Sequence, residues 1–401
     1  MKTIDDLELN NQRVLLRADL NAPMKQDANG QMQITDDGRL RASVTTINDL
    51  RKKNAKIIIL AHLGRPKGER KPELSLKPIA KRLSELVGES IKFIDDLNDA
   101  STLEAVNSMQ SGEIIMIENI RFEKDETSKD QSERQRLAQK LAKLGDAFVI
   151  DGFGVVHREQ ASVTDIARLL PKASGRLVQA EQKAFDRVLN NPERPYVVVL
   201  GGSKVSDKLG VINNLISKVN KILIGGGMAF TFLKAQGYEV GDSLLEVDRI
   251  EEVKQLLLTA KEKNVEIVLP IDIVISTSLD GTSPVSEVDF DKIPVGQKGL
   301  DIGSKTAELF ADKIRDAKTV VWNGPMGVFE VNAFAKGTKT VAQALANSAA
   351  YSVVGGGDSA AAIRLLGLDE SKFDHISTGG GASLELLEGK VLPGLAVLEE
   401  A

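Results

Sequence analysis

The 401-residue chain contains no cysteine. Disulfides, thiolate metal sites, iron–sulfur clusters and cysteine nucleophiles are therefore excluded. Histidine is also scarce, with three residues far apart in the sequence, and no HExxH-type zinc motif is present. No apolar run is as long as a membrane-spanning helix, and the N-terminus lacks the basic and apolar segments of a secretory signal. We therefore expect a cytoplasmic protein without a membrane partner.

The chain has no strong excess of charge of either sign. Lysine and arginine number 52 against 57 aspartates and glutamates, which gives a net charge of −5. A mildly acidic chain is a poor non-specific ligand for nucleic acid, so we expect no nucleic-acid partner. The 42% of apolar residues is ordinary for a globular protein. At about 100–200 residues per domain, the length predicts two or three domains.

Short runs rich in valine and isoleucine alternate with amphipathic helical segments such as Leu76–Val87, Ser132–Leu144 and Arg249–Lys263. Consecutive apolar positions are typical of strands covered on both faces, and they predict the following strands. These are Arg13–Leu20, Ala55–His62, Ile91–Asp95, Glu113–Glu118, Ala147–Asp151, Tyr196–Gly201, Lys221–Gly225, Glu266–Ser276, Thr319–Asn323 and Tyr351–Gly355. The alternation predicts an α/β protein with two Rossmann-like three-layer domains, each with a mostly parallel sheet. The helical segment Gly175–Pro195 is predicted to join them as a connecting helix and hinge.

Basic residues follow the predicted strands of the first half. Arg39, His62, Arg65, Arg121 and Arg158 lie at or near strand ends, and His157 precedes Arg158. Ligands of open parallel sheets bind beyond the carboxyl ends of the strands. Because the arginine fork matches phosphate and carboxylate oxygens, the set predicts a site for a multiply charged small anion. We interpret Arg13 and Arg17, which lie before or within a strand, as ordinary solvated arginines.

Glycine-rich turns follow the predicted strands of the second half, as in GGSKVSDK, GGG at 225–227, NGPMG, GGGDS and TGGGA. Glycine lets backbone N–H groups approach a phosphate, and a following helix adds a favourable dipole. Lys204 and Lys208 are expected on one face of a helix beside such a loop. Asp358 is a candidate Mg²⁺ ligand. The pattern predicts a nucleotide half opposite an anion half, with domain closure needed for reaction.

The chemistry that these residues allow is phosphoryl transfer, which depends on positioning, a metal ion and cationic groups. An ionised carboxylate as nucleophile would need no general base. A nicotinamide-dependent dehydrogenase is an alternative, but GxGxxG is missing. A non-catalytic nucleotide-binding protein or scaffold is a second alternative, which loss of Arg39, Lys204 or Asp358 would favour.

Eight segments in order resemble the phosphoglycerate kinase family: RVLLRADLNAP, AHLGRP, ENIRFEKDE, DGFGVVHRE, GGSKVSDKL, WNGPMGVFE, GGGDS and STGGGASLE. The resemblance implies reversible, Mg²⁺-dependent, in-line transfer between 1,3-bisphosphoglycerate and ADP, giving 3-phosphoglycerate and ATP. It implies a monomer with small-molecule substrates. Residues 1–174, with a returning tail at about 388–401, would bind 3-phosphoglycerate. Residues 175–195 would be the connecting helix and hinge, and 196–387 would bind the nucleotide. ATP and GTP are not distinguished.

The family's roles carry over by position. The substrate-binding set would be Asp19, Leu20, Asn21, Arg39, His62, Leu63, Gly64, Arg65, Arg121 and Arg158. The catalytic set would be Arg39, Lys204, Gly379, Gly380 and Gly381, around the transferring phosphoryl group. The nucleotide would be bound by Lys208, Gly225, Gly226, Asn323, Glu330, Gly356, Gly357, Asp358 and Ser359. Asp358 would also bind the metal.

The chain departs from the family at five positions. Leu20 stands for a usual phenylalanine, and Ser359 for a usual threonine whose hydroxyl it keeps. Gln160 replaces a second histidine, and because it cannot be cationic we expect weaker anion affinity. Val155 and Val156 replace smaller or hydroxylated residues near Arg158.

Overall fold

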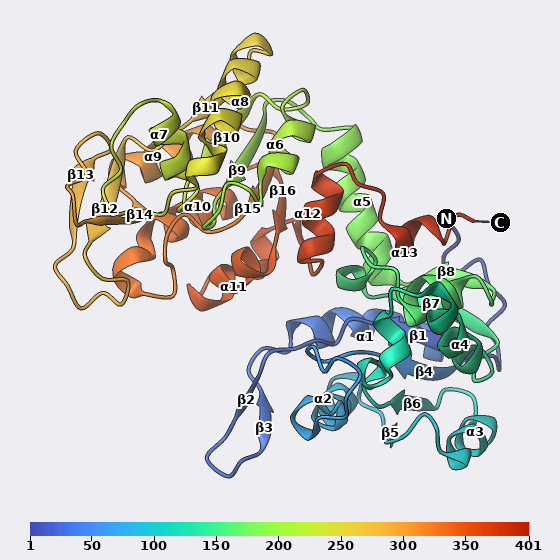
Figure 1. The fold of residues 1–401 in the computed structure, drawn as a ribbon. Helices are drawn as coiled ribbons and strands as arrows, with labels where there is room; N and C mark the ends of the chain where they lie inside the picture. Colours follow the sequence, from blue (N-terminus) through green and yellow to red (C-terminus); the bar gives the residue numbers. More distant parts are fainter. Residues whose placement is uncertain (401) are drawn as a thin grey trace. The chain divides into compact units, whose positions relative to one another are not determined.

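The computed structural model describes residues 1–400, which divide into two compact units, 1–182 with the segment from Val391 onward, and 183–390. Each unit is built on one six-stranded sheet in which every pairing is parallel (Figure 1). The α/β class with two mostly parallel sheets is therefore confirmed. Within residues 1–400 no helix combines the length and apolar character needed to cross a membrane.

The sheet of unit 1 has the strand order β5-β6-β4-β1-β7-β8. Its strands are β1 (Arg13–Ala18), β4 (Lys56–Leu60), β5 (Ile91–Ile94), β6 (Ile114–Ile117), β7 (Ala147–Asp151) and β8 (Lys172–Ser174). Both faces of the central strands are buried, as Ile57, Ile58 and Ile59 show by their zero exposure. Apolar residues on consecutive positions therefore favour strands here, because helices cover the sheet on both sides.

The helices of unit 1 are α1 (Gly38–Lys52), α2 (Lys77–Val87), α3 (Ala100–Asn107), α4 (Gln131–Ala142) and α13 (Pro393–Ala396). Apolar residues of α1 and α2, such as Ile47 and Leu83, pack against Val14 and Leu16 of β1 in one core. A hairpin of β2 (Met24–Gln26) and β3 (Met32–Ile34) precedes α1 and extends outward (Figure 1).

The C-terminal segment belongs to unit 1. The N–H of Gly394 in α13 donates to the carbonyl of Val156 at 2.7 Å, and Arg168 pairs with Glu400 at 3.0 Å. A side chain at Gly394 would lie within 3.0 Å of Val156, so glycine is required for this close approach. Val155 and Val156 are themselves buried, which places these two departures from the family in the packing beneath the tail.

Helix α5 (Arg176–Asn190) runs from unit 1 into unit 2. Its first residue is held by unit 1, because the Arg176 guanidinium bonds to Asp5 and Asp49. The side chain of Asp151, at the end of β7, accepts the N–H of Leu177 at 2.9 Å and satisfies one of the free donors of the first turn. The N-terminus of α5 is therefore fixed by both charge pairs and a capping carboxylate.

The sheet of unit 2 has the order β11-β10-β9-β15-β16-β17. Its strands are β9 (Tyr196–Leu200), β10 (Lys221–Ile224), β11 (Glu266–Val268), β15 (Thr319–Asn323), β16 (Tyr351–Gly355) and β17 (His375–Ile376). The helices are α6 (Leu209–Leu215), α7 (Ala229–Ala235), α8 (Ile250–Glu262), α9 (Ser304–Arg315), α10 (Lys336–Ala346), α11 (Gly357–Leu365) and α12 (Gly381–Leu387). Phe310 of α9 and Val341 of α10 pack on Val320 and Trp322 of β15.

A second, antiparallel sheet of three strands lies in unit 2, with β12 (Asp272–Ser276) between β13 (Ser286–Asp289) and β14 (Lys298–Ile302). The prediction of one strand over Glu266–Ser276 is wrong, because the segment forms β11 in one sheet and β12 in another. Pro270 lies between them, and proline lacks the N–H that a continuous ladder needs.

Candidate functional site

The carboxyl ends of β1, β4, β6 and β7 lie at one edge of the parallel sheet of unit 1. Polar side chains follow each of these ends, as the sequence predicts. Asp19 follows β1, His62 follows β4, and Arg121 lies in a 3-10 turn after β6, η2 (Ile120–Phe122). Arg158 follows another 3-10 turn after β7, η4 (Phe153–Val155).

Hydrogen bonds join three of these loops. The Arg39 Nη1 atom lies 3.0 Å from both carboxylate oxygens of Asp19. The Asn21 side-chain oxygen accepts the N–H of Gly64 at 2.9 Å, and Arg121 Nη1 donates to the Gly64 carbonyl at 2.9 Å. Gly64 has a φ of +63°, a conformation that favours glycine. The loops after β1, β4 and β6 are therefore held in one network.

His62 lies at the centre of the positive charge and is 4% exposed. Its pKa is well below the ordinary value, because burial disfavours the imidazolium and because Arg17, Arg121, Arg39 and Arg158 repel it. Burial lowers the pKa of Arg121 to about 10, and the neighbouring arginines Arg17 and Arg158 act in the same direction. Unit 1 thus brings three of the four predicted arginines together around His62.

The side chain of Arg158 is hydrogen-bonded to His157, the residue that precedes it in the sequence. Its Nε donates to the Nε2 of His157 at 2.9 Å. Burial, followed by repulsion from Arg158, lowers the pKa of His157 to about 4, so the ring is neutral at pH 7. A neutral histidine can accept this bond, and it therefore holds the guanidinium without competing for the anion.

Three other predicted residues are placed differently. Arg65 has an exposed side chain. The side chains of Leu20 and Leu63 are 0% and 4% exposed and belong to the core of unit 1. Only their backbone atoms could therefore contact a ligand.

Two residues that were interpreted from their place in the sequence are buried. The interpretation of Arg17 as solvated is wrong, because this side chain is 0% exposed and faces His62. Strand residues alternate between faces, and Arg17 lies on the face opposite Leu16 and Ala18 of the core. Gln160 is 1% exposed, and its backbone carbonyl accepts the N–H groups of Val163 and Thr164.

In unit 2 the glycine turns meet beyond the carboxyl ends of β9, β15 and β16. They enclose a polar cavity of about 130 Å³. Its lining residues are Gly201, Gly202, Ser203, Lys204, Asp207, Lys208, Asn323, Gly324, Pro325, Gly356, Gly357, Asp358 and Ser359. Seven of the predicted catalytic and nucleotide-binding residues are therefore in one place, although they come from three separate loops.

Lys204 and Lys208 do not share a helical face, and this expectation is wrong, because α6 begins only at Leu209. Both lysines lie in the turn before that helix and still line the same cavity. Lys208 Nζ contacts the side-chain oxygen of Asn323. Burial lowers the pKa of Lys208, while Asp207 and Asp358 oppose this effect.

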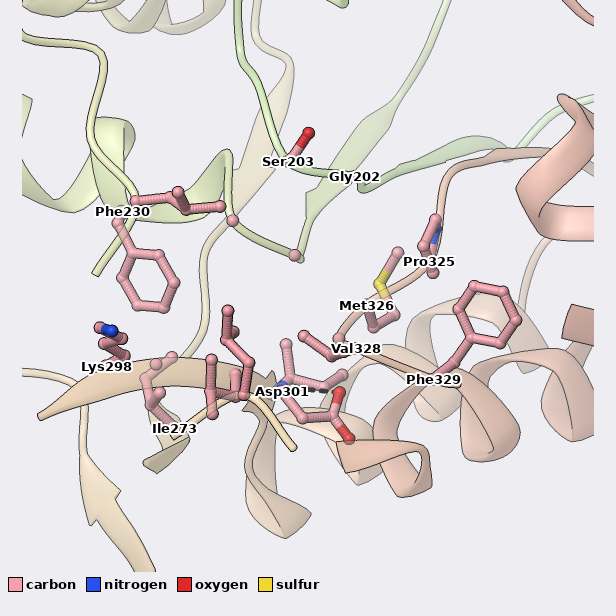
Figure 2. A pocket seen from close by; sticks show the side chains of 18 of the residues that line it. Gly202, Ser203, Phe230, Ile273, Lys298, Asp301, Pro325, Met326, Val328 and Phe329 are labelled. Atoms are coloured by element: carbon pink, nitrogen blue, oxygen red, sulfur yellow. Dashed lines mark hydrogen bonds between the residues drawn. The ribbon is translucent and has the colours of Figure 1, made fainter. Parts of the chain in front are cut away.

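A larger cavity of about 380 Å³ adjoins the polar one, because Gly202, Ser203, Pro325 and Asp358 line both. Figure 2 shows Phe230 of α7 and Ile273 of β12 on one side of it and Met326 on the other. Predominantly apolar walls with a few polar groups are typical of sites for flat organic ligands.

Glycine is required where the two cavities meet. Gly226 has a φ of +66° and lines the larger cavity. A Cβ on Gly226 would lie 2.6 Å from the backbone nitrogen of Gly202 and 2.8 Å from the Pro325 carbonyl. Glu330, also predicted for the nucleotide, lines the larger cavity with an exposed side chain.

Four predicted glycines line neither cavity. Gly225 lies behind Met326, because a Cβ there would be 2.5 Å from the methionine sulfur. The turn Gly379–Gly381 follows the edge strand β17 and leads into α12. The Gly379 N–H donates to the Ser377 hydroxyl at 3.1 Å. Their predicted contacts with ligands remain predictions.

Asp358 fits the carboxylate of a Mg²⁺ site shared with a nucleotide. It is exposed in the first turn of α11 and lines both cavities. Mg²⁺ is commonly bound by one or two carboxylates together with substrate phosphate oxygens. Next to it, the Ser359 hydroxyl accepts the Gly324 N–H at 2.7 Å, so this hydroxyl joins the loops after β15 and β16. Within residues 1–400 there is no cluster of three or more histidine, aspartate or glutamate side chains suited to a metal ion.

The apolar lining of the larger cavity was not found from the sequence. Phe230, Ile273, Leu300 and Val328 come from α7, β12, β14 and the loop after β15. Val328 lies in the segment WNGPMGVFE, but the segments that carry Phe230, Ile273 and Leu300 have no motif, and their apolar residues resemble any core residue. These aromatic and aliphatic residues can be recognised as the lining of a cavity only when the fold has placed the antiparallel sheet beside the glycine turns.

Comparisons with known proteins give one consistent result. The family model described as phosphoglycerate kinase matches residues 4–390. The phosphoglycerate kinase of Bifidobacterium longum (strain DJO10A) is 56% identical over 406 residues and 100% of both chains. That of Clavibacter sepedonicus is 54% identical over 99% of both. Among solved structures, phosphoglycerate kinase from Coxiella burnetii matches with a TM-score of 0.86 and 39% identity, covering 99% of this chain and 98% of that chain.

Proposed function

The chain belongs to the phosphoglycerate kinase family, and from this premise we propose how its residues divide the work of transferring phosphate between a carboxyl group and ADP. As a member of this family it uses ATP and ADP as co-substrates. We propose that unit 1 binds 3-phosphoglycerate and that unit 2 binds the nucleotide. The observation that carries the proposal is the pair of dissimilar sites, a cationic cluster in one unit and two joined cavities in the other.

The cationic cluster suits 3-phosphoglycerate because this molecule carries both a phosphate and a carboxylate. Arg121 and Arg158 supply guanidinium groups to the phosphate, and His62 adds a ring N–H. Asp19 and Asn21 supply oxygen atoms that can accept the substrate hydroxyl. Arg39, now held by Asp19 at 3.0 Å, supplies positive charge at the reacting carboxyl group.

The joined cavities suit ATP or ADP. The apolar cavity of unit 2 accepts the base and the ribose, with Glu330 at the ribose. The polar cavity accepts the phosphates. Lys208 supplies one ammonium group to them, and Asn323 and the glycine turns supply N–H groups. Lys204 is placed on the transferring phosphoryl group together with the N–H groups of Gly379–Gly381.

The step is a direct displacement. A β-phosphate oxygen of ADP attacks the phosphorus of the C1 phosphate, a new P–O bond forms, and the bond to the carboxyl oxygen breaks. The carboxylate leaves with the electron pair, and no proton has to move because a carboxylic acid is ionised at neutral pH. The reverse step starts from the same ionised carboxylate. The chain therefore needs no general base, and its task is to position the reactants and to stabilise charge.

Mg²⁺, when bound with the nucleotide, neutralises phosphate charge. Asp358 would hold it, and Lys208 and Asn323 would orient the phosphates beside it. Transfer requires that the two ligands meet, so we propose that both substrates together drive closure of the units. Small-angle scattering with neither, one and both substrates tests this. Curves that coincide under all three conditions would contradict closure. Cytoplasmic location and a monomeric state stay predictions from the sequence.

Two variants test the division of labour. Arg158→Ala removes an exposed arginine of the cluster, and Lys208→Ala removes the half-buried ammonium of the polar cavity. Calorimetric titration is expected to show weaker 3-phosphoglycerate binding only in the first and weaker ATP binding only in the second. Arg136→Ala, on the exposed surface of α4, is the control and is expected to change neither affinity. Weaker binding of both 3-phosphoglycerate and ATP in either variant would contradict the assignment of one ligand to each unit.

A further inference from the structure

A fully buried arginine lies directly behind His62. Arg17 is at the end of β1, beside the end of β4 that His62 follows. Its Nη2 lies 3.3 Å from His62 Nδ1, and its Nη1 donates to the Ala18 carbonyl at 2.6 Å. Its Nε donates to the Ser162 hydroxyl at 2.9 Å. All three nitrogens of the guanidinium are therefore in use, and the group cannot rotate without losing these bonds.

The far end of this arrangement is a buried carboxylate. The Ser162 hydroxyl donates to Glu126 Oε1 at 2.6 Å, and the Ser162 N–H donates to Oε2 at 2.9 Å. Ser162 and Glu126 have zero exposure, so both carboxylate oxygens are satisfied away from water. An isolated charge in such a place would be very costly, and Glu126 supplies the opposite charge that Arg17 needs.

Ser162 owes its position to an unusual turn. It lies in η5 (Ala161–Asp165), which is a π-helical turn. Such turns are rare, and they occur frequently at functional sites because the extra residue in the turn re-aims the side chains. Here the turn places one hydroxyl between Arg17 and Glu126. The series Glu126–Ser162–Arg17–His62 thus joins the 3-10 turn η3 (Lys124–Thr127), η5, β1 and the loop after β4 in unit 1.

The direction of the bond between Arg17 and His62 is decided by chemistry. Arginine has only donors and stays protonated in proteins. The Nδ1 atom of His62 must therefore accept, and a proton on Nδ1 would face the N–H of Arg17. The tautomer of a histidine is set by the hydrogen bond that its other nitrogen makes. In neutral His62 the proton is therefore on Nε2.

We propose that Arg17 is a positioning residue that fixes His62 in the Nε2–H tautomer, so that this ring offers a substrate phosphate one neutral N–H donor. The inference rests on the proposed function, in which this cluster binds 3-phosphoglycerate. Arg17 acts through His62, and Ser162 and Glu126 keep Arg17 in place.

The charges that face His62 agree with a neutral ring. Arg17 faces it from β1, Arg39 from α1, Arg121 from η2 and Arg158 from the segment after η4. Burial and these four cations hold the pKa of His62 well below its ordinary range. Protonation would also place an N–H against Arg17. The donor therefore stays the same across the physiological pH range.

The tautomer of His62 can be measured directly in the ligand-free wild-type protein. Long-range ¹H–¹⁵N correlation spectra distinguish the two ring nitrogens, and His62→Gln identifies the signal among three histidines. Expected is a protonated Nε2 and an unprotonated Nδ1 from pH 6 to pH 8. A protonated Nδ1, in either the neutral ring or the imidazolium, would overturn the proposal. If the tautomer is as expected but 3-phosphoglycerate does not bind, the proposed function and the role of the ring toward substrate fail, whereas the positioning of His62 by Arg17 stands.

Ser162→Ala tests the support of Arg17 without removing the arginine. We expect partial protonation of Nδ1 in His62 and a roughly 3–10-fold higher KM for 3-phosphoglycerate, with kcat within twofold and an unchanged KM for ATP. Uniform loss of binding has this signature. Thr164→Val is the matched control, since its buried hydroxyl lies in the same turn and bonds to the Gln160 carbonyl instead. A higher KM with an unchanged tautomer in Ser162→Ala, or equal effects in both variants, would refute the role of Arg17.

Discussion

Arg39→Ala separates catalysis from nucleotide binding. Arg39 lies in the first turn of α1, and its guanidinium is held 3.0 Å from both oxygens of Asp19. We place this guanidinium at the reacting carboxyl group. The residues that line the two nucleotide cavities all belong to unit 2, whereas Arg39 belongs to unit 1.

The expected loss follows from the role. Removing one preorganised donor to developing charge costs about 2.7–4 kcal/mol, which corresponds to roughly 10²–10³ in kcat. The loss of folding stability should be much smaller, because Arg39 is 31% exposed and a partly exposed ion pair contributes about 0–1 kcal/mol. The variant should therefore fold and bind ATP as the wild type does, and yet turn over very slowly.

Steady-state kinetics with both substrates, together with calorimetric titration of ATP, measures these quantities. Arg41→Ala is the matched control, since Arg41 lies on the same helix, is 60% exposed and pairs with Asp37. It is expected to keep kcat within twofold. Equal losses of kcat and ATP affinity in Arg39→Ala, or an equal loss of kcat in Arg41→Ala, would refute the assigned role.

Three further predictions concern unit 2. Asp358→Ala should weaken ATP binding only when Mg²⁺ is present, and an affinity that is unchanged across a magnesium titration would exclude it as a ligand. Gly226→Ala should destabilise the protein by about 2–5 kcal/mol through left-handed backbone strain and overpacking. The control Gly237→Ala, at a φ of +95° with no atom within 4 Å of the new Cβ, should show only the strain of about 1–2 kcal/mol. Equal urea midpoints for the two variants would contradict the predicted clash at Gly226. Burial raises the pKa of Asp301 from 3.8 to about 7, so the contribution of this group to stability is full below pH 4 and is lost as the pH rises toward 7. Asp301→Asn should therefore flatten the fall of the urea midpoint between pH 5 and pH 7. An unchanged slope in this variant would contradict the prediction.

The parallel strands could be predicted because each is covered on both faces. Val197–Val199 and Ile57–Ile59 are buried throughout, so the sequence shows uninterrupted apolar runs. The same rule misses strands of other kinds. The hairpin β2–β3 and the strand β13 are short and polar, and β17 has only two residues.

The site was predictable where function demands an unusual residue at a strand end. Arg121 and Lys208 are charged residues in turns that follow strands, and the structure places Arg121 beside Gly64 and Lys208 in the polar cavity of unit 2, while their roles toward ligands stay predictions. The interpretation of Arg17 was wrong because this residue lies within an apolar strand, where the sequence gives no sign of its buried contacts. The position of its guanidinium depends on a hydrogen bond to Ser162, which is far away in the sequence. A contact between such distant residues leaves no local sequence pattern.

We propose above all that this chain transfers phosphate between ATP and 3-phosphoglycerate. The most direct test is a spectrophotometric assay with ATP, Mg²⁺ and 3-phosphoglycerate, coupled to a dehydrogenase that consumes the bisphosphoglycerate formed. We expect turnover that requires all three components and that falls about 10²–10³-fold in Arg39→Ala. Folded protein that binds ATP and 3-phosphoglycerate but forms no bisphosphoglycerate would contradict it.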